Sequence, residues 1–551
     1  MNSAYDNYII SAIKELPTTQ EEFSKLKKKL SKLYQLPLPT NADMRDRYNT
    51  LVLEKKVVAS KAFEAILLSR AIRTQSGVAV VAVLTKSYPC PGKCIYCPSE
   101  KDMPKSYLSN EPAVMRAIDS HFDPYLQMQN RLRSLEINGH KTDKIELIVM
   151  GGTFSFLPKA YQKKFITRCF QAANEYNKSY KVHKVIKFIK SKKTADEKLL
   201  EQQKKNEKAQ HRIIGLTLET RPDYIDEKEV INFRLLGCTR VELGVQSIYD
   251  DVLELNKRGH LVSETVRATK LLKDAGFKIN YHMMPGLPGS TPTRDFKMFK
   301  QLFVSQDFQP DMLKIYPTVV LKNTVLYNWW KKAKSRSVSR SESATGRQYK
   351  PLSNKTFEKL VVKIKNEAII PYVRIARLIR DVPTPSIIAG PTISNLRQII
   401  IPQSNCPCIR CREVGGEFIS EEKIILDRID YAASDGKEIF LQYVTSDKKK
   451  LFALLRLRIP NNSKAHFLPV LQNAALIREV HTYGKLTQID QQDASSPQHL
   501  GFGKKLLLEA ERIAKEEFGL KKIVVISGVG VRGYYKKQGY KLSQTYLIKS
   551  L

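Results

Sequence analysis

Three of the eight cysteines, Cys90, Cys94 and Cys97, lie on one short stretch with the spacing C-x3-C-x2-C. The prolines and glycine within and after this stretch favour tight turns, so the three thiolates can converge on one metal centre. A closed zinc site takes four ligands, and the neighbouring sequence provides no fourth. An iron–sulfur cube held by three cysteines instead leaves one iron open. A structural zinc loop and chance clustering are the alternatives.

With Tyr96 directly before the last cysteine, the stretch resembles the cluster motif of radical S-adenosylmethionine enzymes. The resemblance implies a [4Fe-4S] cluster whose open iron binds S-adenosylmethionine and cleaves it to a 5′-deoxyadenosyl radical. The stretch "VMGGTF" (149–154) follows the second predicted strand and fits the glycine motif of the same superfamily. Glycine there permits close backbone approach, although a plain tight βα loop would also use it.

A second group of residues indicates nucleotide chemistry: "QHLGFGKKLL" (498–507) reads Q-x-x-G-x-G at the start of a predicted helix. Gly501 and Gly503 would let backbone N–H groups at the helix N-terminus face a pyrophosphate. The pattern resembles the acetyl-CoA signature of GNAT acetyltransferases. In that family "REVHTYG" (478–484) would be the splayed strand, and "GVRGYYKKQGY" (530–540) would bring a tyrosine near the thioester. Of the two adjacent tyrosines, one is expected only to pack in the core.

A second cysteine trio, Cys406, Cys408 and Cys411, has the spacing C-x-C-x2-C. Its position between two domains and the lack of an adjacent glycine motif favour structural zinc. The sequence does not identify the fourth ligand, because no histidine lies between residues 283 and 465. Cys169 and Cys238 fall singly within predicted elements, which is typical of core residues.

Short apolar strands alternate with helices before residue 320, which predicts a parallel sheet, open or barrel-like, with polar residues at the carboxyl ends of its strands. From about residue 413 the pattern changes to antiparallel strands, a helix and a further strand. The fold class is therefore α/β: a partial (β/α) barrel followed by a second α/β domain. The expected domains are a basic helical segment 1–75, the barrel 76–350 with insertions 181–212 and 331–350, a linker with the zinc site 351–412, and the second domain 413–551.

Lysine and arginine outnumber aspartate and glutamate by 92 to 55, a formal net charge of +37. Such an excess favours a polyanionic partner, most simply nucleic acid, although solvated lysines of a lysine-rich proteome would also produce it. No segment has the ~18 apolar residues of a membrane span. The first residues show no signal-peptide pattern, so we expect the reducing cytoplasm and no membrane partner.

The whole pattern resembles the family of the catalytic third subunit of Elongator, in its archaeal-like form. Resembling stretches include "EPAVMRAI" (111–118), "ETRPDY" (219–224), "NKRGH" (256–260), "HMMPGLPG" (282–289) and "IREVHTYG" (477–484), and the resemblance covers residues 70–551 apart from the insertions. It implies an enzyme that modifies C5 of the wobble uridine of tRNA. The radical would take a hydrogen from the methyl group of acetyl-CoA, the carbon would add to the uracil ring, and thioester hydrolysis would leave 5-carboxymethyluridine.

The resemblance also implies roles for individual residues. Cys90, Cys94 and Cys97 would hold the cluster, and Lys159 would reach from the barrel toward acetyl-CoA. The residues expected to seat S-adenosylmethionine are Gly151, Gly152, Thr153 and Gln246. Those expected to bind acetyl-CoA are Glu479, Val480, His481, Thr482, Gln498, Gly501, Phe502, Gly503, Lys504 and Tyr535, with catalytic positions at Lys159, His481, Tyr534 and Tyr535. His282 and Tyr316, at predicted strand ends, are expected to face the substrate.

The tRNA anticodon loop is the expected partner, because an unpaired uridine leaves its stack at little cost. Accessory Elongator-type subunits and a homodimer both stay open. Three other functions compete: a protein lysine acetyltransferase with a scaffolding barrel, a nucleic-acid-binding subunit without chemistry, and a methylthio-transferring radical enzyme. The intact cysteine trio and glycine turn argue against a barrel that serves only as a scaffold. A methylthio-transferring enzyme would have no use for the acetyl-CoA motif.

Overall fold

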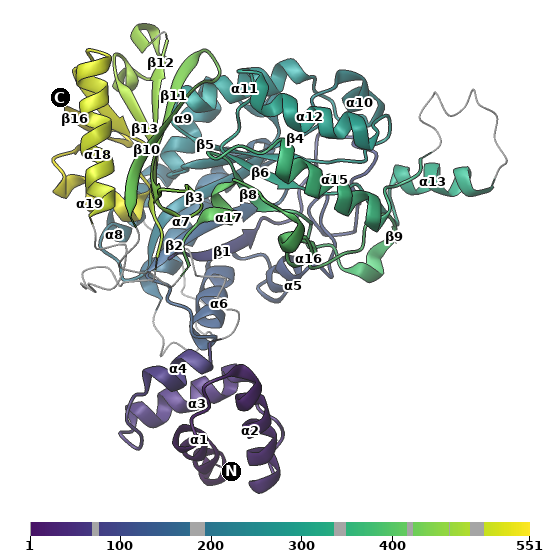
Figure 1. The fold of residues 1–551 in the computed structure, drawn as a ribbon, viewed down its shortest axis with the longest axis vertical. Coiled ribbons are helices and arrows are strands. Elements are labelled where there is room, and N and C mark those ends of the chain that lie inside the picture. Colours follow the sequence, from purple (N-terminus) through teal and green to yellow (C-terminus); the bar gives the residue numbers. More distant parts are fainter. Residues whose placement is uncertain are drawn as a thin grey trace.

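The computed structural model describes residues 2–68, 77–176, 193–335, 349–415, 423–461, 463–484 and 501–551. The described residues contain two seven-stranded sheets with their covering helices and a separate group of N-terminal helices (Figure 1). No helix among the described residues is long and apolar enough to cross a membrane.

The N-terminal helices pack around their own apolar cluster, which includes Phe23, Tyr48 and Phe63. They are α1 (Asn2–Lys14), α2 (Gln20–Leu33), α3 (Asn41–Leu53) and α4 (Lys61–Ile66). Capping boxes begin α2 and α3, which satisfies backbone donors that a helix start would leave free. Figure 1 shows this group projecting from the rest of the molecule beside α6 (Pro124–Ile137). The guanidinium of Arg45 contacts the main body at Gly139, where a Cβ would lie 2.7 Å from Arg45 Cζ.

The first sheet is parallel throughout, in the order β1-β2-β3-β4-β5-β6-β8. Its strands are β1 (Ala79–Leu84), β2 (Lys144–Met150), β3 (Arg212–Thr220), β4 (Arg240–Gln246), β5 (Lys278–Met283), β6 (Met312–Ile315) and β8 (Arg374–Arg377). Each strand is hydrogen-bonded to the next in chain order, and helices such as α6, α7 (Lys159–Glu175) and α11 (Val262–Asp274) pack against it. This arrangement confirms the partial barrel, because crossover helices cover a parallel sheet.

Two parts of the sequence analysis need correction. β8 lies inside the span 351–412 that we predicted as a linker, so the first sheet continues past residue 350. The lysine-rich insertion 181–212 contains α8 (Ala195–Asn206), which buries Leu199 against α7. Lys204 and Lys205 of α8 are exposed, and the lysine-rich sequence of this segment hid the apolar contact. Residues 181–192 and 336–348 of the two insertions lie outside the described residues.

The other helices of the barrel connect and cover its strands. They are α5 (Pro112–Asp119), α9 (Glu227–Leu236), α10 (Asp250–Leu255), α12 (Pro292–Val304), α13 (Val325–Ser335), α15 (Asn354–Glu367), α16 (Leu396–Ile400) and α17 (Ile409–Arg412). A two-stranded sheet of β7 (Val320–Leu321) and β9 (Ile387–Ala389) lies apart from the main one.

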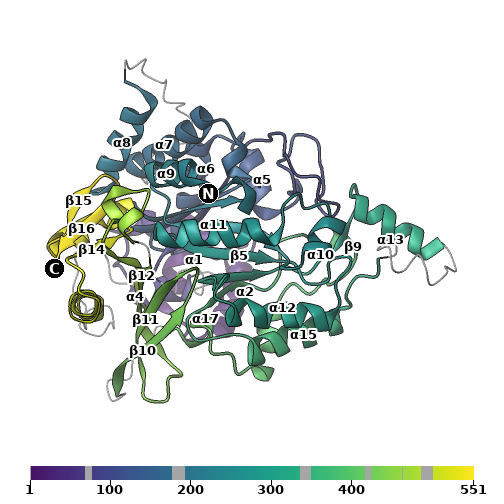
Figure 2. The same ribbon diagram turned by 90° about the horizontal axis from the view of Figure 1, so that it is seen from above.

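The second sheet has the order β10-β11-β12-β13-β14-β16-β15 and is antiparallel except between β13 and β14. Its strands are β10 (Ile424–Ala432), β11 (Gly436–Thr445), β12 (Leu451–Pro460), β13 (Ala475–Thr482), β14 (Lys522–Val525), β15 (Lys541–Ser543) and β16 (Tyr546–Ser550). Helix α18 (Phe502–Arg512) packs on β12 and β13, and the short α19 (Arg532–Lys537) follows β14. In Figure 2, β14 to β16 lie at the edge of the molecule opposite α13.

The second sheet packs against the amino ends of the barrel strands. Gly528 and Gly530 allow this approach, because a Cβ on either would overlap the backbone at the start of β3. Asp311, directly before β6, accepts two hydrogen bonds from Arg478 of β13, with Nη1–Oδ2 2.8 Å and Nη2–Oδ1 2.7 Å. Arg478 also donates to Glu438 of β11, at 3.3 Å.

Further cations complete this buried network. Lys273 of α11 lies 3.7 Å from Glu438 and 3.9 Å from Asp311, and none of these side chains is exposed by more than 1 %. Burial raises the pKa of Asp311 and Glu438, but the surrounding cations, with Arg478 the strongest, outweigh it and hold both pKa values below the ordinary range. Both carboxylates therefore stay charged in the core of the interface.

We expect Asp311→Ala to destabilise the protein by about 3–5 kcal/mol, because it removes one of the two buried carboxylates beside Arg478 and Lys273 and leaves an excess of buried positive charge. Urea unfolding followed by circular dichroism measures the loss. Asp307→Ala is the matched control: this exposed aspartate should change the free energy of unfolding by no more than about 0.5 kcal/mol. Equal unfolding midpoints for the two variants would contradict the role given to the network.

Candidate active sites at the two sheets

The first cysteine loop follows β1 at the carboxyl edge of the barrel sheet. Backbone hydrogen bonds fix it on both sides: Ile95 N–H donates to Asn256 at 3.2 Å, and Leu326 N–H donates to Ile95 at 3.0 Å. Cys94 is buried. A hydrogen bond from Cys97 and the charge of Arg258 lower the pKa of its thiol to about 4, against the effect of burial. A thiol that ionises this readily is suited to metal ligation.

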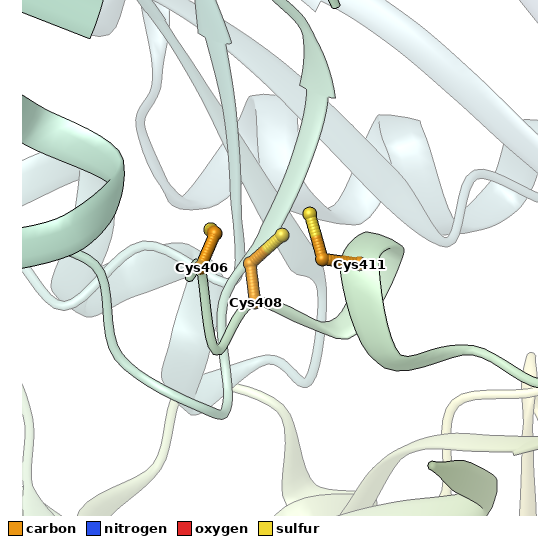
Figure 3. A group of neighbouring side chains, drawn as sticks. All are labelled: Cys406, Cys408 and Cys411. Atoms are coloured by element: carbon orange, nitrogen blue, oxygen red, sulfur yellow. The ribbon is translucent and has the colours of Figure 1, made fainter. Parts of the chain in front are cut away.

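The two cysteine trios differ in how tightly their sulfurs gather. Among the described residues, only Cys406, Cys408 and Cys411 place three metal-ligand atoms within 4.8 Å of one another (Figure 3). Zinc–sulfur bonds of about 2.3 Å bring thiolates to about 3.8 Å from each other, so this compact trio fits one zinc ion. The more open trio of the first loop fits a cluster of several irons better than a single ion.

The compact trio sits after β8, with Cys406 and Cys408 buried and Cys411 exposed. Lys365 of α15 lies beside it, with Nζ 3.5 Å from Cys411 Sγ. No histidine or carboxylate of the described residues joins the three sulfurs, so the fourth ligand is still unassigned. The ammonium group of Lys365 offsets part of the negative charge that the thiolates of Cys406, Cys408 and Cys411 would carry.

Two arginines that the sequence analysis did not assign hold the first cysteine loop. Arg258, after α10, donates to Cys94 Sγ at 3.4 Å. Arg221, after β3, donates to both carboxylate oxygens of Asp223, at 2.9 and 2.8 Å, and to the Gly259 carbonyl at 3.2 Å. Both lie in stretches that carried the family resemblance, "NKRGH" and "ETRPDY". The presence of a charged residue inside a stretch that resembles the family was the only sequence signal that could have identified these two arginines.

Arg221 also makes a glycine necessary in the cysteine loop. A Cβ at Gly92 would lie 2.5 Å from Arg221 Nη1, 3.6 Å from Cys90 Sγ and 3.7 Å from Cys94 Sγ. Nη1 is buried and has no hydrogen-bond partner among the described residues. The guanidinium therefore lies against the loop with one donor turned to the region of the sulfurs.

The residues predicted to seat S-adenosylmethionine have unusual backbones. Gly151 (φ +136°) and Gly152 (φ +91°) follow β2, and a Cβ at Gly151 would overlap Thr85 Oγ1. Gln246, at the end of β4, has φ +70° although it is not glycine, and its buried Oε1 finds no hydrogen-bond partner in the described part of the chain. Thr153 follows the glycines and its side chain caps no backbone N–H. A strained backbone and a free polar atom are typical of ligand sites.

A polar network connects three barrel strands. Glu242 of β4 pairs with His282 of β5 (Nε2–Oε2 2.8 Å) and with Lys314 of β6. Burial raises the pKa of Glu242, but Lys314 and His282 outweigh it, so the pKa lies well below its ordinary value. His282 also packs edge-on against Tyr316, with 5.5 Å between ring centroids. The structure thus brings together the two residues predicted to face the substrate, beside a charged carboxylate.

In the second sheet, β13 and β14 pair only from Ala475 to Ile477 and then separate. At the end of β13, Thr482 lies beside the first turn of α18: the Cβ position of Gly503 is 3.7 Å from Thr482 Cγ2 and 2.9 Å from Tyr534 Oη. Gly501, with φ +69°, has no atom within 4 Å of its Cβ position. Three stretches chosen from the sequence therefore meet at one helix N-terminus.

The other predicted acetyl-CoA residues lie as follows. Phe502 stacks on Tyr443 at 4.4 Å, Val480 packs against the core, and Lys504 is exposed. Gln498 lies outside the described residues. Tyr535 is only 7 % exposed and belongs to the apolar core, whereas Tyr534 is 40 % exposed and has its hydroxyl over Gly503. Of the two tyrosines, Tyr534 is the one with its hydroxyl at the glycine loop.

Glu479 joins the two sheets. It accepts from Arg456 of β12 and from Lys278 at the start of β5, each at 2.9 Å. Burial raises its pKa, but these two cations hold it well below the ordinary range. A bulge beside it leaves Arg478 as an extra residue, since Arg456 pairs with Glu479 and Leu457 with Ile477. The carboxylate is thus fixed by both sheets.

Lys159 does not reach the second sheet in this structure. It lies at the start of α7 and forms an ion pair with Glu229 in the first turn of α9. The far end of α9, at Gly237, is the end that approaches Val529 of the second sheet, with 3.3 Å to the Cβ position. A helix of this length separates its ends by about 15 Å, so Lys159 lies at the end of α9 away from Val529, and its contact with acetyl-CoA stays a prediction.

Comparison with known families and proteins agrees with the barrel geometry. Residues 86–302 match the family model described as Radical SAM superfamily, and residues 310–403 match the Radical_SAM C-terminal domain. The chain is 42 % identical over 566 residues to the tRNA uridine(34) acetyltransferase of Methanocaldococcus infernus, covering 98 % of each chain. It is 38 % identical to Elongator complex protein 3 of Homo sapiens, over 88 % of this chain and 86 % of that one.

A solved structure is also similar: the Methanocaldococcus infernus Elp3 with an N-terminal deletion has a TM-score of 0.70 and 41 % identity. The match covers 86 % of this chain and 100 % of that chain. The tRNA uridine(34) acetyltransferase of Dehalococcoides mccartyi is 43 % identical over 87 % of this chain and 99 % of that one. Similarity therefore extends through both sheets.

The environment of His481 generates a prediction about pH. Burial lowers its pKa to about 4, and Nε2 has no hydrogen-bond partner among the described residues. Its ordinary value is about 6.5, so between pH 6.5 and 4 the unfolded chain binds more protons and stability falls with falling pH. Urea unfolding should show His481→Gln losing roughly 1–2 kcal/mol less than the parent protein between pH 7 and 4.5. Parallel losses would contradict the assignment.

Proposed function

Since this chain belongs to the family of the tRNA uridine(34) acetyltransferases and Elongator complex protein 3, we propose that it modifies uridine 34 of tRNA as a radical S-adenosylmethionine enzyme. The observation that carries the proposal is the cysteine loop at the carboxyl edge of a parallel half-barrel, in one chain with a splayed strand and a glycine-rich helix start. In finer detail, we propose that an acetyl-CoA methyl group is added at C5 to give 5-carboxymethyluridine.

The cluster would be held by Cys90, Cys94 and Cys97, and the open spacing of their sulfurs supports this fit. Gly151, Gly152 and Gln246 are the residues proposed to seat S-adenosylmethionine. When bound, the two groups would supply the radical that activates the acetyl methyl group. Arg258 would donate to the sulfur of Cys94 and stabilise negative charge there. Pairs such as Glu242 and His282 would be available to hold or move a proton near the substrate.

Acetyl-CoA would bind where β13 leaves β14. Backbone N–H groups of the Gly501–Gly503 turn would face its pyrophosphate, with Thr482 and the Tyr534 hydroxyl at the same helix start. Glu479 lies in β13 and accepts a hydrogen bond from Lys278 of the barrel, so it would place a carboxylate between this site and the barrel. A second domain of GNAT acetyltransferase type is part of this proposal.

The net charge of +37 supports tRNA as the partner, with phosphate contacts along the N-terminal helices and the barrel. The cysteine ligands would need a reducing compartment, so we propose the cytoplasm. Accessory Elongator-type subunits or a second copy are the partners to test next. The compact trio of Cys406, Cys408 and Cys411 is proposed to hold structural zinc.

The central experiment uses anaerobically reconstituted protein with tRNA, S-adenosylmethionine, a reductant and methyl-deuterated acetyl-CoA. We expect deuterium in 5′-deoxyadenosine and carboxymethyluridine in the digested tRNA. Both signals should fall to background in Cys94→Ala, because two cysteines hold the cluster poorly. Cys169→Ala, a buried core cysteine outside both trios, should keep both signals if it folds, as its melting temperature will show.

The competing functions give different results. Acetyl-CoA hydrolysis without label transfer, unchanged in Cys94→Ala, would exclude the radical reaction and favour a protein lysine acetyltransferase with a scaffolding barrel. Binding of tRNA without any turnover would favour a subunit without chemistry.

The zinc proposal has its own test. Elemental analysis of protein purified without added metal should find about one zinc per chain, and Cys408→Ser should lose most of it and melt at a lower temperature. Reconstituted iron should stay at the parent level in the same variant, since the other trio is untouched. Full retention of zinc in Cys408→Ser, with its loss in Cys94→Ala, would reverse the assignment.

A further inference from the structure

Three aromatic side chains from consecutive βα connections lie together at the carboxyl edge of the barrel. Tyr88 follows β1, Phe156 follows β2 and Tyr224 follows β3. The ring centroid of Phe156 lies 6.2 Å from that of Tyr88 and 5.7 Å from that of Tyr224, and both contacts are edge-to-face. Tyr88 is 37 % exposed and Phe156 39 % exposed. We call these three residues the aromatic row.

The aromatic row adjoins the cysteine loop. Tyr224 lines a cavity of about 620 Å³ together with Gly92 and Lys93 of that loop and with Lys257. Lys93 and Lys257 are exposed and form no ion pair within the described residues. The guanidinium of Arg221 lies 5.8 Å from the centre of the Tyr224 ring. The same cavity is lined by the carboxylates Asp223 and Glu254, and Asp223 is paired with Arg221. The aromatic row thus ends, at Tyr224, in a cavity beside the cysteine loop that also presents two exposed lysines.

A row of aromatic rings that leads to a cavity with exposed lysines matches one ligand chemistry best. Bases of single-stranded RNA stack on aromatic side chains, while lysines meet the phosphates between them. A base-paired stem cannot offer its base faces to the row. An apolar peptide or a second copy of the chain would leave the lysines without partners, and the charge of +37 favours a polyanion.

We infer that the aromatic row is a stacking platform for the unpaired bases beside the reacting uridine of the RNA substrate. The inference deepens the proposed function and rests on it. A uridine that reaches the cysteine loop must leave its stack, which costs a few kcal/mol. Rings at the loop entrance would replace the stacking that the neighbouring bases lose, so the platform would lower the cost of presenting the target base.

The test measures binding of the full-length protein to a synthetic anticodon stem-loop by fluorescence anisotropy. We expect Tyr88→Leu, Phe156→Leu and Tyr224→Leu each to weaken binding about tenfold, with the salt dependence unchanged. Tyr88→Phe should bind like the parent, because it keeps the ring. Lys93→Ala and Lys257→Ala should instead each lower the slope of log affinity against log salt by about 1.

Two controls keep the test specific. Val304→Ala, an exposed apolar residue on α12, should not change RNA affinity, and melting temperatures identify any variant that fails to fold. A stem-loop with an abasic site next to the target uridine should bind the parent more weakly. For the Tyr88→Leu and Phe156→Leu variants, the abasic stem-loop and the intact stem-loop should bind with equal affinity.

Leucine variants that fold and bind the stem-loop like the parent would overturn the inference, and so would an equal loss of affinity for a fully paired hairpin. Either result would leave the proposed function intact if the parent still forms the modified uridine. Failure of the proposed function shows differently: the parent would transfer no label to 5′-deoxyadenosine, whatever the row does for binding.

Discussion

A cluster of buried, mutually paired charges holds the two sheets together. Asp311 and Glu438 lie among Lys273, Arg458 and Arg478, and each of these side chains is almost fully buried. Any one of these charges, buried alone, would destabilise the fold by several kcal/mol. They become tolerable only when both sheets are in place. Asp311 and Lys273 belong to the barrel, and their partners Glu438, Arg458 and Arg478 belong to the second sheet. The relative position of the sheets is therefore fixed by electrostatics as well as by apolar packing.

This constraint determines where chemistry can occur. The cysteine loop and the glycine turn lie at the carboxyl ends of the barrel strands, whereas Lys278, which holds Glu479, begins β5 at the amino end. The six residues of β5 span about 20 Å. The pairs formed by Glu242 with His282 and Lys314 lie along this path. Under the proposed function, an acetyl group that starts beside Glu479 would have to cross about this length of the barrel to reach the cysteine loop.

Much of this arrangement could be predicted from local sequence. Cysteine spacing, glycine turns and apolar strands are local signals, and they led to the barrel and to the meeting of Thr482 with Gly503. Contacts between distant segments could not be predicted. Arg221 and Arg258 approach the cysteine loop only through tertiary packing, β8 is too short to stand out, and the lysines of α8 concealed its buried side. The choice between Tyr534 and Tyr535 and the pairing of Lys159 with Glu229 depend on how neighbouring helices dock.

The position of the Arg221 side chain has a consequence for evolution of the sequence. Its guanidinium fills the space beside both Gly92 and Gly259, where added Cβ atoms would lie 2.5 and 3.1 Å from its nitrogens. A side chain at position 92 would need a smaller residue at 221 or a shift of the guanidinium, and either change would weaken the pairing with Asp223. Gly259 is required in addition by its φ of +77°. Positions 92, 221 and 223 should therefore drift together among relatives, as one covarying unit. Substitutions within the unit should be tolerated in combination where each alone is rejected.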